Sequence, residues 1–128
     1  MQIRVYYEDT DCGNVVYYAN YLRFMERSRT ELLRERGIDL RDYQKRGILF
    51  VVAEAHVFYR APARYNDLLD VDSTIVDLSA ASMLIRTHIR IAGEERVLVL
   101  GEVRIACINT AGKPLRIPEE VRSRTRPA

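Results

Sequence analysis

The sequence predicts an α+β domain in which an antiparallel sheet wraps around one long helix. Apolar residues between positions 15 and 37 recur at three- and four-residue steps, which is the period of an amphipathic helix. After about position 47, apolar and polar side chains alternate, which is the period of a strand. The links between these later segments are short, and short links join antiparallel strands. One helix cannot cover both faces of a sheet, so we expect a single sheet curled around the apolar face of the helix.

The N-terminal part is expected to be a strand, a turn and the helix. Residues 2–8 alternate as a strand does, and residues 9–14 are rich in turn formers. The helix is expected to begin between positions 15 and 20, and Gly37 supplies its C-terminal stop.

The C-terminal part is expected to be all sheet. The alternation predicts strands over 48–60, 69–77, 83–91 and 96–109. Gly93-Glu94 fits a hairpin turn, and Gly112 begins the stretch that ends the last strand. The wide face and the edges of such a sheet stay apolar and unpaired in a monomer, so we expect a dimer.

Composition narrows the functional classes. A chain of 128 residues is expected to be one domain over 1–128. A net charge of +2 gives no argument for a nucleic-acid partner. No apolar run approaches the ~20 residues that span a bilayer, and the N-terminal residues do not resemble a signal peptide, so we expect a cytoplasmic protein. Two isolated cysteines and two histidines form no ligand pattern, so we expect no metal and no cofactor.

The segment before the helix carries the most informative pattern. A strand delivers Asp9 and Asp11 into a turn that contains Gly13, and the turn leads into the helix start. The amides at a helix start are unpaired and can hold a developing oxyanion, while a carboxylate beside them can attack a carbonyl or activate water. A thioester suits so small a site, because a thiol of pKa about 8.5 leaves without strong acid assistance. Asp and Gly are also common turn and cap residues, and the residues alone leave that commoner interpretation open.

The same segment resembles the signature of the 4-hydroxybenzoyl-CoA thioesterase family, above all its bacterial acyl-CoA branch associated with the Tol-Pal system (YbgC-type). The matching positions are Tyr7, Asp9, Thr10, Asp11, Gly13, Val15, Val16, Tyr17, Ala19, Asn20 and Tyr21. The likeness continues through residues 26–31, 47–54, 59–64 and 112–118, and therefore spans nearly the whole chain.

This resemblance implies a hot-dog fold that is active as a dimer or a dimer of dimers. It places the catalytic carboxylate on Asp11, and the backbone N–H that polarises the thioester carbonyl on Tyr18, while Asp9 holds the turn. The chain departs from the acyl-CoA branch at Tyr18, where that branch usually has histidine, and at Asn14, where glycine is more usual.

The expected substrate-binding residues are Gly13, Val15, Tyr21, Val51, Val52, Ala53, Arg60 and Pro62. Arg60 is a candidate for the phosphates of coenzyme A, which enters as part of the substrate. Val51, Val52 and Ala53 are expected along a substrate channel. The side chains of Val15, Tyr18 and Tyr21 either shape the acyl pocket or belong to the core.

The expected function is hydrolysis of an acyl-CoA, or an acyl carrier protein thioester, to a carboxylic acid and a thiol. Asp11 serves as nucleophile or as general base. A non-catalytic acyl-CoA-binding or scaffold protein is the alternative. A hot-dog hydratase or dehydratase is less favoured, because such enzymes pair a histidine with a helix carboxylate and no histidine lies near this helix.

Overall fold

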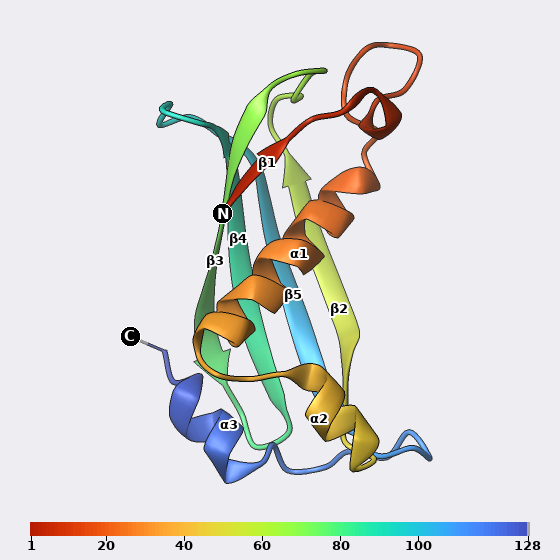
Figure 1. Ribbon diagram of the computed structural model, residues 1–128, viewed down its shortest axis with the longest axis vertical. Coiled ribbons are helices and arrows are strands. Elements are labelled where there is room, and N and C mark those ends of the chain that lie inside the picture. Colours follow the sequence, from red (N-terminus) through yellow and green to blue (C-terminus); the bar gives the residue numbers. More distant parts are fainter. Residues whose placement is uncertain (128) are drawn as a thin grey trace. The chain divides into compact units, whose positions relative to one another are not determined.

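The computed structural model describes residues 1–127 and has the expected α+β class (Figure 1). The long helix and the strands are β1 (Gln2–Arg4), α1 (Asn20–Glu35), β2 (Leu49–Tyr59), β3 (Leu68–Leu78), β4 (Ser82–Ile91) and β5 (Val97–Ile108). The five strands form one antiparallel sheet in the order β1-β3-β4-β5-β2. The predicted succession of strand, long helix and four strands is therefore confirmed.

Short turns join β3 to β4 and β4 to β5, whereas β1 pairs with β3 from far away in the sequence. β1 pairs with β3 in the register Gln2↔Asp70 and Arg4↔Leu68. The turn between β4 and β5 holds Gly93 at φ +82, a left-handed conformation that glycine adopts at little cost. In β5, every second residue from Val99 to Cys107 is buried, as the alternation predicts.

The helix α1 forms because its apolar positions fall on one face. Phe24 and Met25 have no exposed surface, whereas Arg23, Glu26 and Arg27 on the other face are exposed. The helix stops as expected at Gly37, which lies at φ +77 and donates its amide to a carbonyl of the last turn.

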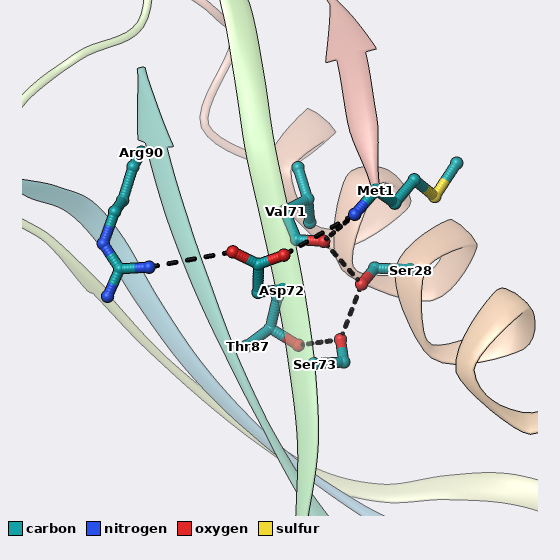
Figure 2. Close-up of polar contacts among 7 residues, drawn as sticks. All are labelled: Met1, Ser28, Val71, Asp72, Ser73, Thr87 and Arg90. Atoms are coloured by element: carbon teal, nitrogen blue, oxygen red, sulfur yellow. Dashed lines mark hydrogen bonds and ion pairs between the residues drawn. The ribbon is translucent and has the colours of Figure 1, made fainter. Parts of the chain in front are cut away.

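Contacts divide the chain into two compact units, of which the first comprises residues 1–31, 57–73 and 87–101. Here α1 lies so close to β5 that a Cβ added to Gly101 would meet the side chain of Met25, with Sδ at 2.6 Å. Figure 2 shows a row of hydroxyls from α1 to β4, in which Ser28 Oγ lies 2.8 Å from Ser73 Oγ and Ser73 Oγ lies 2.7 Å from Thr87 Oγ1. These hydroxyls, of which those of Ser28 and Thr87 are buried, bond to one another and keep the helix and the strands in register.

The second unit comprises residues 32–56, 74–86 and 102–128, of which 128 lies outside the described residues. It contains the short helices α2 (Leu40–Lys45) and α3 (Glu119–Arg124). The Tyr43 hydroxyl donates to Glu120 at 3.3 Å, and Arg122 donates to the Ser79 carbonyl at 2.6 Å. These bonds tie the two short helices into the unit.

The structure corrects three details of the predicted elements. The first strand ends at Arg4 instead of position 8, because residues 7–9 form a 3-10 turn, η1 (Tyr7–Asp9). The helices α2 and α3 were not predicted at all. Each has only six residues, too few to show a helical period in the sequence.

Candidate active site

Asp9 fixes the loop that leads to α1. Its carboxylate accepts the Tyr6 amide on one oxygen and the Asn20 side-chain amide on the other, both at 2.8 Å. Its backbone carbonyl accepts the Tyr17 amide at 2.9 Å. Asp9 is only 9% exposed, and these three bonds tie the 3-10 turn to the first residue of the helix. This is the turn-holding position that the sequence suggested for it.

Asp11 lies on the tip of this loop and is exposed. Its Oδ1 accepts the Gly13 amide at 2.8 Å, and its own amide donates to the Val15 carbonyl at 3.0 Å. Asn14 occupies the left-handed region at φ 60, and its amide donates to the Asp11 carbonyl at 3.1 Å. The Gly13 amide therefore orients the carboxylate, whose Oδ2 accepts no hydrogen bond from residues 1–127.

Tyr18 lies in the turn that starts α1. The carbonyl of Tyr17 accepts the Asn20 amide at 2.8 Å, and the carbonyl of Tyr18 accepts the Tyr59 hydroxyl at 3.0 Å. Within the described residues the Tyr18 amide has no acceptor. Amides at the start of a 16-residue helix carry a partial positive charge, so this N–H is suited to hold a developing oxyanion.

A depression of about 280 Å³ opens beside this turn. Its lining residues are Val16, Tyr18, Tyr21, Tyr59, Arg60, Ala61 and Pro62. The Tyr59 ring contacts both other tyrosines, with its centroid 6.3 Å from that of Tyr18 and 5.6 Å from that of Tyr21. The lining is thus largely aromatic and apolar, with Arg60 as its one charged residue.

Two tyrosines that line the depression, Tyr21 and Tyr59, have raised pKa values. Burial is the main cause for Tyr21, whose pKa is lowered somewhat by the Ala63 amide and raised further by the charges of Tyr59, Asp67 and Asp11. Burial also raises the pKa of Tyr59, and the neighbouring Tyr18 adds to the effect. Both phenols are consequently neutral at physiological pH.

The structure brings together part of the predicted site. Four predicted residues line the depression, namely Tyr18, Tyr21, Arg60 and Pro62. Asp11, Gly13 and Val15 belong to the adjoining loop, where Val15 forms a bridge with Arg64. Tyr21 is 3% exposed and therefore belongs to the core, and it also lines the depression. Its hydroxyl accepts the Ala63 amide at 3.0 Å.

Val51, Val52 and Ala53 belong to the second unit, where they form an exposed stretch of β2. Sequence reasoning assigned no role to Tyr59 or Ala61. Tyr59 is the last residue of β2 and directly precedes Arg60, so its place next to a predicted binding residue was the available signal.

The cysteines and the possible metal ligands among residues 1–127 offer no second site. Residues 1–127 contain no group of three or more histidine, cysteine or acidic side chains placed to hold a metal ion. Cys12 is exposed and Cys107 is buried, and burial raises the pKa of the Cys107 thiol. No helix among the described residues is both long and apolar enough to cross a membrane.

Comparison with known proteins identifies the family. Acyl-CoA thioester hydrolase YbgC of Escherichia coli O6:H1 is 37% identical over 120 residues, covering 93% of this chain and 89% of that protein. The crystal structure of a probable thioesterase from Bartonella henselae superposes with a TM-score of 0.86 at 37% identity, covering 92% of this chain and 97% of the other.

A 1,4-dihydroxy-2-naphthoyl-CoA thioesterase from Synechocystis gives a TM-score of 0.91 at 24% identity over 98% of this chain and 93% of the other, which confirms the hot-dog fold. The profile of the thioesterase-like superfamily matches residues 5–125. This match covers nearly the whole chain, including the Asp11 loop, α1 and every strand from β2 to β5, and the chain belongs to the thioesterase-like superfamily.

Proposed function

We propose that this protein hydrolyses acyl-CoA thioesters to a carboxylic acid and free coenzyme A. The observation that carries the proposal is an exposed carboxylate, Asp11, on the loop that leads into the free Tyr18 amide at the start of α1. The depression lined by Tyr18 and Tyr21 offers space for an acyl group next to that amide. The relative named acyl-CoA thioester hydrolase, at 37% identity over 93% of the chain, supports this assignment.

In the proposed reaction the thioester carbonyl oxygen accepts a hydrogen bond from the Tyr18 amide. The carbonyl carbon is then attacked, the carbonyl oxygen gains negative charge, and the carbon–sulfur bond breaks to release the thiolate of coenzyme A. A well-placed amide donor contributes about 2.7–4 kcal/mol to such a step. The donor is a backbone group, so it does not depend on histidine, which tyrosine replaces at position 18.

Asp11 acts in one of two ways. As a nucleophile, its carboxylate oxygen bonds to the acyl carbon and gives an anhydride that water then hydrolyses. As a general base, it takes a proton from the water that attacks the acyl carbon. A single turnover in H₂¹⁸O, followed by mass spectrometry of the peptide that contains Asp11, tests the anhydride route, because label enters Asp11 only if water attacks the anhydride on its side.

The charged phosphates of coenzyme A indicate which residues bind the rest of the substrate. We infer that Arg60, which lines the depression, binds a phosphate of coenzyme A, because a guanidinium pairs well with phosphate oxygens. Val51, Val52 and Ala53 remain proposed channel residues. An acyl carrier protein thioester presents the same acyl–sulfur bond and is a second candidate substrate.

We also propose that the protein is a cytoplasmic homodimer or homotetramer. The edge strand β2 exposes large apolar side chains, of which Val52 is 54% and Phe58 55% exposed. An exposed apolar edge strand is a surface on which a second chain can pair. Light scattering of the purified protein measures the oligomeric state directly.

Thiol release from a panel of short, long and aromatic acyl-CoAs tests the proposed function. We expect steady release of free coenzyme A from at least one member of the panel. Tight binding without thiol release would support a scaffold protein instead. A product that gains a double bond, with no thiol released, would identify a dehydratase.

A further inference from the structure

The hydroxyl of Tyr59 makes a bond that packing alone does not require. Tyr59 is the last residue of β2, and its hydroxyl donates to the backbone carbonyl of Tyr18, 41 positions earlier, at 3.0 Å. The Tyr59 side chain is about half exposed, so water could have satisfied this hydroxyl without a protein partner. The bond instead joins the end of a strand to the turn that starts α1.

Two hydrogen bonds hold the peptide units on either side of the Tyr18 Cα. The unit between Tyr17 and Tyr18 is held because the Tyr17 carbonyl accepts the Asn20 amide at 2.8 Å. In a trans peptide the N–H points opposite to the C=O, so the Tyr18 N–H points away from the body of the helix. The next unit, between Tyr18 and Ala19, is held at its carbonyl by Tyr59.

Holding both units restricts the φ and ψ angles of Tyr18. Without the Tyr59 hydroxyl, the unit between Tyr18 and Ala19 loses its side-chain partner and can rotate. The Asn20 amide that follows it then holds the Tyr17 carbonyl less firmly, and the Tyr18 N–H of that same peptide unit loses its fixed direction. An oxyanion donor is effective only if it is fixed in advance, since the rate gain comes from not having to reorient during the reaction. A donor misplaced by about 1 Å can cost as much as 100-fold in rate.

We propose that Tyr59 is a positioning residue for thioester hydrolysis, holding the Tyr18 turn so that its free amide meets the thioester carbonyl oxygen. This inference rests on the proposed function. Tyr59 also lines the depression beside the Tyr18 turn, so its ring has a packing role that is distinct from the role of its hydroxyl. Because burial raises the pKa of Tyr59, the hydroxyl keeps its proton and remains a donor at neutral and mildly alkaline pH.

The variant Tyr59→Phe separates the two roles, because it removes the hydroxyl and keeps the ring. Tyr43→Phe is the matched control, since the Tyr43 hydroxyl bonds instead to Glu120 in the second unit. We expect Tyr59→Phe to lower kcat by about 10-fold or more, with KM changed less than about twofold and the melting temperature nearly unchanged. The control should match the wild type in both constants.

Three results would overturn the role of Tyr59: an unchanged kcat, a rise in KM without a fall in kcat, or an equal fall in kcat in the Tyr43→Phe control. Should Tyr59→Phe prove unstable, a fluorinated tyrosine at position 59, whose phenol ionises nearer neutral pH, replaces it. Its kcat should then fall at a lower pH than that of the wild type, and identical pH profiles would contradict the proposal.

Asp11→Asn, measured alongside, distinguishes a failure of the role of Tyr59 from a failure of the proposed function. If Asp11→Asn is inactive while Tyr59→Phe is fully active, the function stands and the role of Tyr59 falls. If the wild type hydrolyses no thioester, the function itself falls.

Discussion

Exchanging the two partners of the Asp9–Asn20 hydrogen bond tests how the loop before α1 is held. In the wild type, one carboxylate oxygen of Asp9 accepts the Asn20 side-chain amide and the other accepts the Tyr6 amide, both at 2.8 Å. Asp9→Asn replaces the carboxylate by a neutral amide, so the charge-assisted bonds from the Tyr6 amide and the Asn20 side chain are lost. Bonds to charged groups contribute about 1.5–3 kcal/mol in proteins, and Asp9 is largely buried, so we expect a loss of about 2–3 kcal/mol.

The reverse single change is also destabilising, for a different reason. Asn20→Asp brings a second carboxylate next to Asp9, and two like charges about 4 Å apart near a protein surface repel each other by about 4 kcal/mol. The positive end of α1 offsets this by about 0.3–1 kcal/mol, which leaves a loss of roughly 3 kcal/mol.

The double variant, Asp9→Asn combined with Asn20→Asp, restores both bonds. The oxygen of the amide introduced at position 9 accepts the Tyr6 amide, and the NH₂ group of the same amide donates to the carboxylate introduced at position 20. We therefore expect the double variant to lie within about 1 kcal/mol of the wild type, which gives a coupling energy of about 4 kcal/mol or more between the two sites. Denaturant unfolding of all four proteins measures this cycle, and thiol release should recover together with stability. Additive single effects would refute the account of the loop.

Three further predictions follow from other contacts. Gly101→Ala should destabilise the protein by about 1–3 kcal/mol, because the new Cβ meets the fully buried Met25, and the loss should be smaller in a Met25→Ala background; equal losses in both backgrounds would contradict this. A thiol reagent should modify only Cys12 in the native protein, because Cys107 is buried and its thiol has a raised pKa. Cys107 should react only after unfolding. Fast reaction of two thiols in the native state would be inconsistent with the structure. The pKa of Tyr21 is raised in the folded state, so its contribution to stability is complete below its unfolded-state pKa of about 10. That contribution is lost as the pH rises through the folded-state pKa. The free energy of unfolding should therefore fall above about pH 10, and it should fall less steeply in Tyr21→Phe.

The sequence predicted the fold well where a period ran long enough to be read. The alternation in β5 and the apolar stripe of α1 each extend over more than ten residues, and their bounds agree with the structure within a few positions. The six-residue helices α2 and α3 show no such period and were missed. The first strand was predicted too long, because the bonds of Asp9 to Tyr6 and Asn20 bend residues 7–9 into a 3-10 turn, and the Asn20 partner is distant in sequence.

The local part of the candidate site was predictable from spacing, and the predicted residues Arg60 and Pro62 also line the depression. Asp11, Gly13 and the start of α1 lie within one short segment, so their spacing already placed a carboxylate before unpaired helix amides. The bond from Tyr59 to Tyr18 joins residues 41 positions apart, and no local pattern reveals such a contact. The residue type also gave no signal, because a tyrosine that ends a strand is usually a packing residue.

The most direct test of the central claim is the ratio of kcat/KM for thiol release between the wild type and Asp11→Asn. Asp42→Asn, the same change at an exposed carboxylate of α2, is the matched control. We predict a fall of at least about 100-fold for Asp11→Asn, with an unchanged melting temperature, and no fall for the control. Retention of wild-type kcat/KM in Asp11→Asn would contradict the assignment of Asp11 as the group that attacks the thioester or activates the attacking water.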